Sequence, residues 1–235
     1  LGEVWEDGTT KIAYSRRRKY LLGRETHGLM NYPFRTALLD FLRGGDAAVF
    51  RERMEELREH YPAPAYYGAM NFLSTHDTPR LLTLLGHEGD APATRDERAA
   101  YRLSGEERAR GTALLKLAAL ILYTFPGSPM LYYGDEAGMQ GFEDPFNRGP
   151  YPWGHEDTAL LRYFRQLGAL RKAHEALQRG TIDYCAAQGR VLAFRRTSEG
   201  ERCIAVVNAG EQSAVLTLPW DAPLAQDALT RQSFF

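Results

Sequence analysis

Residues 67–80 read YGAMNFLSTHDTPR, and this stretch indicates the fold class of the chain. Residues 67–73 form a compact apolar and aromatic run that ends in a cluster of polar side chains. Such runs are typical of buried parallel strands, and residues 128–133 have the same character. We therefore predict two strands of a parallel sheet, with His76 and Asp77 at the end of the first.

Helical patterns alternate with these strands over the first three quarters of the chain, as they do in βα units around a parallel sheet. Pro33 predicts the first turn of one helix, and Asp46 can cap the next, whose apolar face includes Val49. Ser104, with Glu107 three residues later, is a capping box that opens a third helix. The sequence therefore predicts an α/β fold.

The chain changes character near Gly180. Asp157 is predicted to cap a long amphipathic helix that ends there. Beyond it, residues 191–195, 203–207 and 213–218 are β-branched and apolar runs separated by turns that contain glycine. This pattern predicts an antiparallel meander.

Two domains are expected from this division. Residues 1–180 hold about four strand–helix units, whereas a closed (β/α)8 barrel has eight units and typically about 250 residues. Residues 181–235 are short for a complete β-sandwich of about 100 residues. We therefore expect half of a barrel, followed by a small and incomplete antiparallel β domain.

Composition excludes several function classes. The 235 residues include 29 basic and 30 acidic ones, so the formal net charge is −1 and no strong cationic field is available for nucleic acid or an anionic membrane. The basic run at residues 16–19 is interpreted as a solvated helix face. The longest mostly apolar run, residues 114–125, is too short for a membrane span, which takes about 20 residues. Neutral ligands are therefore favoured.

The sequence indicates no metal site and no cofactor, and it leaves a structural calcium ion open. Cys185 and Cys203 lack zinc-ligand spacing and are interpreted as small core residues. No glycine-rich phosphate loop and no EF-hand calcium loop occurs. The following histidines also lack metal-ligand spacing and are interpreted as surface or packing residues: His27, His60, His87, His155 and His174.

Two carboxylates are candidates for chemistry. Glu3 and Asp77 each end a strand-like run, and the 74 residues between them match about two βα units, so both can project from one rim of the sheet. Paired carboxylates suit glycosidic cleavage. The residues alone leave other interpretations open, with Glu3 as a solvated terminal residue and the pair of His76 and Asp77 as a strand-end hydrogen bond.

Four segments in order resemble the α-amylase family, glycoside hydrolase family 13, in its cyclomaltodextrinase, neopullulanase and maltogenic amylase branch. Residues 2–5 (GEVW) resemble barrel strand five, 29–34 (LMNYPF) strand six, 72–80 (FLSTHDTPR) strand seven and 127–136 (GSPMLYYGDE) strand eight. The resemblance implies strands five to eight of a (β/α)8 barrel, followed by an incomplete antiparallel β-sandwich domain.

The resemblance also assigns roles to individual residues. Glu3 matches the general acid and base, and Asp77 matches the carboxylate that grips sugar hydroxyls and steadies the distorted ring. His76 matches a hydrogen-bond donor to the same sugar. Trp5 matches a residue that can stack on an acceptor-side sugar.

The loop after strand eight adds two substrate contacts by the same resemblance. Asp144 and Arg148 match an acid and a base, four positions apart, that contact a donor-side sugar, whereas Asp135 and its neighbour match a pair that holds the rim. Glu6 stands where the branch commonly has His. The family's nucleophile, an Asp on strand four, has no counterpart because the resemblance begins at strand five.

Taken together, the resemblance implies a retaining α-glucan hydrolase that cleaves cyclodextrins, maltooligosaccharides or pullulan. We expect the chain alone to be inactive, because it lacks the nucleophile. We expect it to associate with the missing N-terminal half of the barrel or with a second copy, because half a barrel exposes strand edges. The alternatives are a transglycosylase or isomerase of the same family, a non-catalytic relative, and a glucan-binding module. The expected location is the cytoplasm, and a signal peptide in a preceding segment stays open because the chain starts at barrel strand five.

Overall fold

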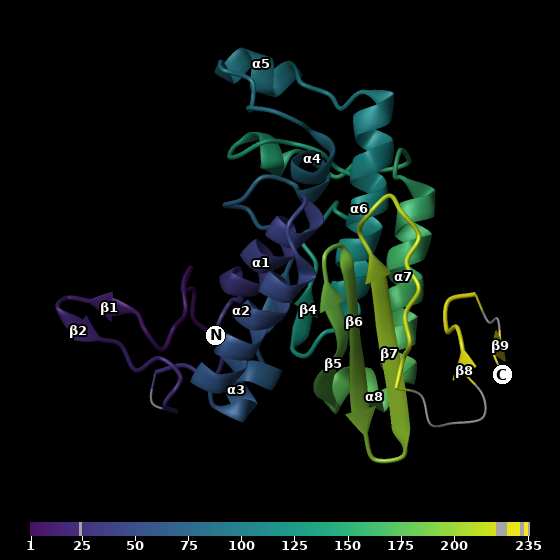
Figure 1. The fold of residues 1–235 in the computed structure, drawn as a ribbon. Helices are drawn as coiled ribbons and strands as arrows, with labels where there is room; N and C mark the ends of the chain where they lie inside the picture. The colour runs from purple at the N-terminus through teal and green to yellow at the C-terminus, as the bar shows by residue number, and fades with distance from the viewer. Residues whose placement is uncertain (24, 220–224, 231–232, 235) are drawn as a thin grey trace.

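The structure, a computed structural model, describes residues 1–23, 25–219, 225–230 and 233–234 (Figure 1). Its helices are α1 (Tyr32–Leu42), α2 (Ala47–His60), α3 (Ala63–Tyr67), α4 (Leu81–Gly86), α5 (Arg95–Ala100), α6 (Gly105–Thr124), the 3₁₀ turn η1 (Phe146–Arg148), α7 (Thr158–Ala173) and α8 (Glu175–Arg179). Its strands are β1 (Ile12–Ala13), β2 (Arg16–Arg17), β3 (Met70–Phe72), β4 (Ser128–Met130), β5 (Thr181–Gln188), β6 (Val191–Ser198), β7 (Glu201–Asn208), β8 (Ala225–Gln226) and β9 (Ser233–Phe234). Over the described residues, none of the helices has the length and apolarity that crossing a membrane requires.

Four segments of the chain pair in parallel, in their sequence order. Gly2 bridges Leu29, and Met30 bridges Met70. β3 then pairs with β4, so that Met70 lies opposite Ser128. The ends of all four segments therefore point to the same edge, which is where the candidate site residues follow in the sequence.

Both predicted parallel strands are present, and both are shorter than predicted. β3 occupies three of the residues 67–73, because two prolines open α3, which runs to Tyr67 and ends at Gly68. β4 occupies the first three of the residues 128–133. The remaining residues of each apolar run therefore lie outside the strand.

Helix caps that the sequence predicts are present. Asp46 Oδ1 accepts a hydrogen bond from a backbone N–H two residues later at 2.8 Å, and Ser104 with Glu107 forms a complete capping box. The position of Val49 is predicted wrongly, since 43% of it is exposed. The buried residues of α2 are 47, 50, 54 and 57, and Val49 lies about 80° around the helix from the nearest of them.

The long helix predicted between Asp157 and Gly180 is two helices. α7 and α8 are separated by His174, whose backbone is extended. Glu201, at the start of β7, accepts a hydrogen bond from Ala176 N at 2.8 Å and lies 2.7 Å from His174 Nδ1. The Glu201 side chain therefore caps α8. The helical pattern of the sequence cannot predict this contact, because Glu201 lies in β7.

β5, β6 and β7 form an antiparallel sheet in chain order. The runs predicted over residues 191–195 and 203–207 lie inside β6 and β7. The strand predicted over residues 213–218 is wrong, because no strand occurs there and Val215 is 99% exposed. An alternating pattern makes a strand only where a neighbouring strand can accept its hydrogen bonds.

Two arginines connect this sheet to the helices by hydrogen bonds. The guanidinium of Arg196, from β6, is fully buried and donates to the carbonyls of Thr124 at 2.5 Å and Gly180 at 2.8 Å. Arg190, in the β5–β6 turn, donates to the carbonyls of Leu42 and Gly45 at 2.9 and 2.8 Å. These carbonyls lie at or beside helix C-termini, where cations are stabilising.

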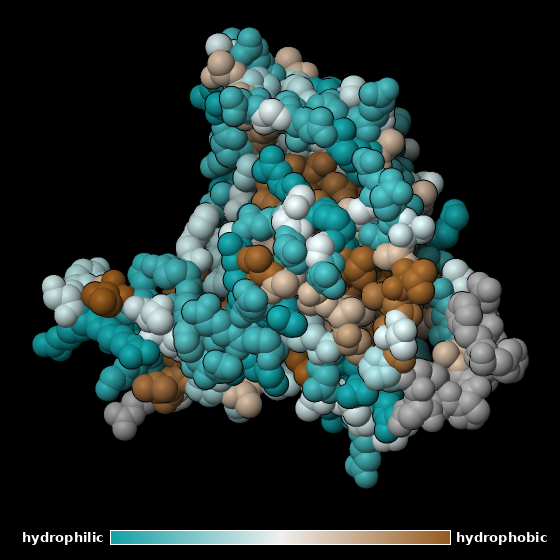
Figure 2. Space-filling view, viewed as in Figure 1, coloured by the Kyte–Doolittle hydropathy of each residue, from teal (hydrophilic) through white to brown (hydrophobic). Residues whose placement is uncertain are grey.

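The basic run predicted as a helix face lies in a β-hairpin instead. β1 pairs with β2 in antiparallel fashion, and the hairpin stands away from the rest of the chain (Figure 1). Most of the surface in the same view is hydrophilic, with a small hydrophobic patch on the hairpin (Figure 2). Ile12, in β1, is 69% exposed.

Candidate active site

Asp77 lies in a cluster of charged side chains beyond the ends of β3 and β4. Asp77 Oδ2 is 3.1 Å from His76 Nε2, and Asp77 Oδ1 is 3.4 Å from Arg148 Nη2. Arg148 Nε also contacts Asp144 Oδ1 at 3.2 Å. Four of the predicted site residues are therefore in contact, although 71 positions separate Asp77 from Arg148. Their side chains are 37–57% exposed, so they are open to a ligand.

Asn147 connects the two loops beneath this cluster, and the sequence analysis missed it. Its side chain is fully buried, and Nδ2 donates to the carbonyls of His76 and Thr78, each at 2.8 Å. Its own carbonyl accepts from Arg80 Nε at 2.9 Å. Asn147 therefore holds the backbone on both sides of Asp77, and a single loop asparagine carries no pattern that predicts this.

A buried ion pair lies behind the same loops. Arg80 is fully buried, Asp135 is 2% exposed, and Arg80 Nη1 is 3.2 Å from Asp135 Oδ1. The guanidinium carbon also lies 4.2 Å from the ring centre of Tyr132, and Nη1 donates to the carbonyl of Tyr133. Burial raises the pKa of Asp135 to about 6, against the opposing charge of Arg80. The pair ties the segment after β4 to the segment after β3.

Glu3 is held by two aromatic side chains. Tyr32 OH donates to Glu3 Oε1 at 3.0 Å, and Trp5 Nε1 donates to the same oxygen at 3.2 Å. The rings of Trp5 and Tyr32 stack with their centres 4.2 Å apart. Trp5 is 54% exposed, so it offers an apolar ring beside the carboxylate. Tyr32, the first residue of α1, is a second residue of the candidate site that the sequence motifs do not reveal.

Tyr32 also links the two carboxylates electrostatically. Burial is the largest of the effects that raise the pKa of Tyr32 to about 12, and the hydrogen bond and charge of Glu3 add to it. The charge of Asp77 raises this pKa further. Glu3 contacts Trp5, and Asp77 contacts His76 and Arg148. Arg148 in turn contacts Asp144, and among the described residues no hydrogen bond or ion pair joins Glu3 to Asp77 directly. Tyr32 lies within the field of both.

This arrangement suits a neutral polyhydroxylated ligand. Carboxylate oxygens accept hydrogen bonds from hydroxyl groups, and Arg148 and His76 supply donors. The exposed ring of Trp5 complements the apolar face of a sugar. Two carboxylates at strand ends are also the groups that glycosidic bond cleavage uses.

One group of possible metal ligands occurs in the described part of the chain, away from these loops. The ligand atoms of His174, Glu201 and Cys203 lie within 4.8 Å of one another. The sequence shows no such spacing, because the group joins the α7–α8 break to β7. Both oxygens of Glu201 already bind His174 and the N-terminus of α8, and burial raises the pKa of the Cys203 thiol to about 11. The group is satisfied as a helix cap.

A parallel α/β sheet whose strand ends carry exposed carboxylates beside an aromatic ring is an arrangement that carbohydrate-active α/β enzymes use. Residues 1–153 match the family model described as the alpha amylase catalytic domain. The chain therefore belongs to the α-amylase family of glycoside hydrolases, and the family predicted from the sequence motifs is confirmed.

The relatives are longer proteins of the same family. An amylopullulanase from Thermoanaerobacter thermohydrosulfuricus is 36% identical over 238 residues, which cover 92% of this chain and 15% of the relative. A cyclomaltodextrinase from Geobacillus thermopakistaniensis (strain MAS1) is 34% identical over 228 residues, which cover 94% of this chain and 33% of the relative. A solved structure of a cyclic α-maltosyl-(1→6)-maltose hydrolase from Arthrobacter globiformis, in complex with cyclic α-maltosyl-(1→6)-maltose, matches with a TM-score of 0.71 and 30% identity, covering 89% of this chain and 41% of that one. The chain spans a third or less of the length of the two curated relatives.

Proposed function

We propose that this chain supplies part of the active site of a retaining α-glucan hydrolase that cleaves α-1,4 bonds in cyclodextrins, maltooligosaccharides or pullulan. The observation that carries the proposal is the cluster of Asp77, His76 and Arg148 at the strand ends, with Glu3 held by Tyr32 beside it. The oligosaccharide named in the complex of the Arthrobacter relative supports a glucan as ligand.

The proposal extends to the architecture. The four parallel segments would be strands five to eight of a (β/α)8 barrel, and residues 181–235 would be a β domain that follows residues 1–180. The parallel order of Gly2, Leu29, β3 and β4 supports this assignment. The proposed partners of the chain are the N-terminal half of the barrel or a second copy of the chain.

We also propose that the protein is located in the cytoplasm.

Glu3 is assigned the proton transfers. As an acid it gives a proton to the glycosidic oxygen while the bond between that oxygen and the sugar C1 breaks. In this first step the nucleophile, which these residues do not include, bonds to C1. As a carboxylate, Glu3 then takes a proton from the water that attacks C1 and breaks the bond between C1 and that nucleophile. Tyr32 and Trp5 both donate to Glu3 Oε1, which leaves Oε2 to face the leaving oxygen.

The remaining site residues are assigned to the sugar. Asp77 accepts hydrogen bonds from its hydroxyls and stabilises the positive charge that develops at C1, and His76 donates to the same sugar. Asp144 and Arg148 bind the next sugar on the donor side. The nucleophile is assigned to a segment outside these 235 residues, so the chain alone is expected to be inactive.

The test is Glu3→Gln in a preparation that contains the whole barrel, assayed by release of reducing sugar from β-cyclodextrin, maltohexaose and pullulan. We expect kcat to fall by about 100-fold or more on each substrate. The matched control is Glu6→Gln, because Glu6 is an exposed carboxylate that pairs with Lys11 instead. Wild-type activity of Glu3→Gln on all three substrates would overturn the proposal.

The exposed ring of Trp5 favours a second candidate, an α-glucan transglycosylase or isomerase of the same family. A sugar stacked on this ring can replace water as the acceptor. Analysis of the products as hydrolysed or transferred glucans separates these two candidates. A non-catalytic glucan-binding relative would bind the glucans without any turnover.

A further inference from the structure

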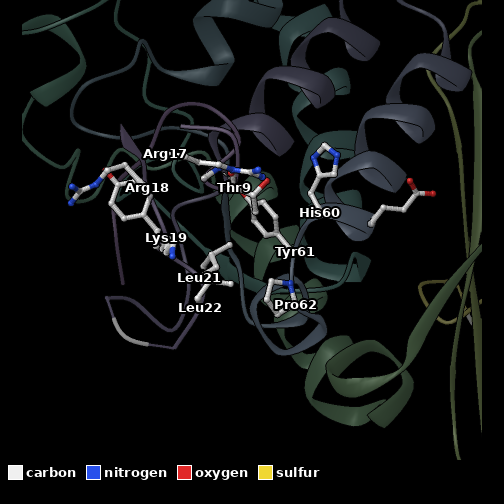
Figure 3. A pocket seen from close by; sticks show the side chains of 12 residues that line it. Thr9, Arg17, Arg18, Lys19, Leu21, Leu22, His60, Tyr61 and Pro62 are labelled. Atoms are coloured by element: carbon white, nitrogen blue, oxygen red, sulfur yellow. Dashed lines mark hydrogen bonds between the residues drawn. The ribbon is translucent and has the colours of Figure 1, made fainter. Parts of the chain in front are cut away.

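A cavity of about 470 Å³, open to solvent, lies between the end of α2 and the segment that begins at Arg17 in β2 (Figure 3). The hairpin turns at Tyr14 and Ser15, whose φ angles are +53° and +59°. Two-residue turns of this kind usually take Asn-Gly, because side chains are strained at positive φ. Arg18 N donates to the carbonyl of Lys11 at 2.8 Å and extends the pairing. The hairpin therefore holds the basic residues that follow its turn in a defined position.

The other wall of the cavity is anchored to the hairpin segment by hydrogen bonds. Gly8 N donates to Tyr61 OH at 3.1 Å, and His60 Nδ1 lies 2.6 Å from Asp7 Oδ2. Asp7 Oδ1 in turn accepts from Thr9 N at 2.8 Å. The charge of Asp7 is thus engaged by His60 and Thr9, and the cavity is formed before any ligand binds.

The lining of the cavity carries an excess of positive charge. Arg17, Arg18 and Lys19 line it, and Glu59 is the one carboxylate among the lining residues. Arg18 pairs with Glu25 at 3.6 Å, whereas no described carboxylate pairs with Arg17 or Lys19. Arg18 Nε is buried and has no hydrogen-bond partner within the described residues. Arg17 Nε donates to the carbonyl of Thr9 at 2.6 Å, which leaves the charge of Arg17 without a carboxylate partner. A buried donor without an acceptor and two cations without a carboxylate partner together favour an anionic ligand.

The rest of the lining is mostly apolar or aromatic, with Tyr20, Leu21, Tyr61 and Pro62. Figure 3 shows Tyr61 and Pro62 on the α2 side of the cavity and Lys19 on the hairpin side. The volume lies within the range of about 300–1,000 Å³ that small-molecule sites occupy. The cavity therefore suits a ligand with one anionic group and a compact body that has an apolar face.

We propose that this cavity binds a sugar phosphate, as the phosphate monoester of a glucosyl unit that is free or carried by an α-glucan chain. The phosphate accepts hydrogen bonds from Arg17, Arg18 and Lys19, and the sugar ring packs against Tyr20 and the exposed Pro62. The phosphate group of the proposed ligand is inferred from the charge of the cavity. The choice of glucose as its sugar rests on the proposed function.

The test is isothermal titration calorimetry of the chain at low salt with glucose 6-phosphate, inorganic phosphate, glucose, AMP and a phosphorylated maltodextrin. We expect glucose 6-phosphate to saturate one site, at least fivefold more tightly than phosphate or AMP, with no measurable binding of glucose. Arg17→Gln and Lys19→Gln should each weaken this binding at least fivefold. Arg16→Gln is the matched control, because Arg16 lies on the same hairpin outside the cavity lining, and it should stay within twofold.

Several results would overturn the proposal. These are no saturation by glucose 6-phosphate, equal weakening by Arg16→Gln, or equal binding of phosphate or AMP. Tighter binding of the phosphorylated maltodextrin would assign the site to glucan chains, and tighter binding of glucose 6-phosphate would assign it to free sugar phosphates. Far-UV circular dichroism verifies that each variant is folded. The binding experiment measures no turnover, so the sugar-phosphate site can be refuted while the Glu3→Gln result still supports the proposed function. Likewise, the proposed function can be refuted while sugar-phosphate binding is observed.

Discussion

Arg80→Met tests whether a buried ion pair holds the two loops of the site together. Arg80 and Asp135 are 0% and 2% exposed and 3.2 Å apart, and Arg80 Nε also donates to the carbonyl of Asn147 at 2.9 Å. Removing one partner of a buried pair costs roughly 3–5 kcal/mol, because the other charge is left uncompensated. Methionine keeps most of the length of the apolar stem, so the loss should measure the guanidinium interactions.

The cost should depend on pH, because Asp135 can lose its charge by binding a proton. Burial raises the pKa of Asp135 to about 6 in the folded chain, and an unfolded Asp has a pKa of about 3.9. The stability that this group contributes is therefore full below about pH 4 and is lost as the pH rises towards 6. Without Arg80 the folded pKa rises further, so the variant should lose about 1.4 kcal/mol more per pH unit above 6, up to its own pKa.

Urea unfolding at pH 5 and pH 8, followed by far-UV circular dichroism, measures the free energy of unfolding. Arg80→Met should be less stable than the parent chain at both values, with the larger loss at pH 8. Arg53→Met is the matched control, because Arg53 pairs with Asp40 at the surface, and it should cost less than about 1 kcal/mol. Equal losses at the two pH values, or a loss at pH 8 no larger than that of the control, would refute the reasoning.

Two further predictions concern buried polar side chains. Asn147→Ala removes two 2.8 Å hydrogen bonds to backbone carbonyls and should lower the free energy of unfolding by about 2–3 kcal/mol, and an unchanged urea midpoint would contradict this. Arg196→Met removes the donors to the carbonyls at the ends of α6 and α8 and should cost roughly 3 kcal/mol, measured as a fall in Tm. Its control is Arg195→Met, whose ion pair with Asp183 is 3.5 Å long and partly exposed. A similar fall in both variants would show that Arg196 has no special role.

The helix starts were predictable because their causes are local. Asp46 and Ser104 cap helices through backbone N–H groups two or three residues away, so the sequence contains both partners of each hydrogen bond. The end of α7 was not predictable, because Glu201 reaches α8 from another element. Residues 213–218 show the converse, an alternating pattern that finds no strand to pair with.

The residues of the candidate site also separate into those that the sequence reveals and those that only the structure reveals. His76 and Asp77 are identifiable because polar residues directly follow a buried apolar run, and Glu3 is identifiable from its motif. Their supports are not identifiable, since Tyr32, Asn147 and the Arg80–Asp135 pair act across 29 to 71 positions. The spacing of residues along the chain does not reveal which loops pack against each other beneath the site.

The sequence by itself determined the family, the α/β class and the helix caps, since these depend on residue order and on contacts within one turn or one strand. Only the tertiary structure decided which side chains meet. It placed Arg148 on Asp77, stacked Trp5 on Tyr32, and turned a basic run into the wall of a cavity. The physical reason is that such contacts form when distant segments are packed together, and their energies depend on burial and distance, which no local pattern encodes.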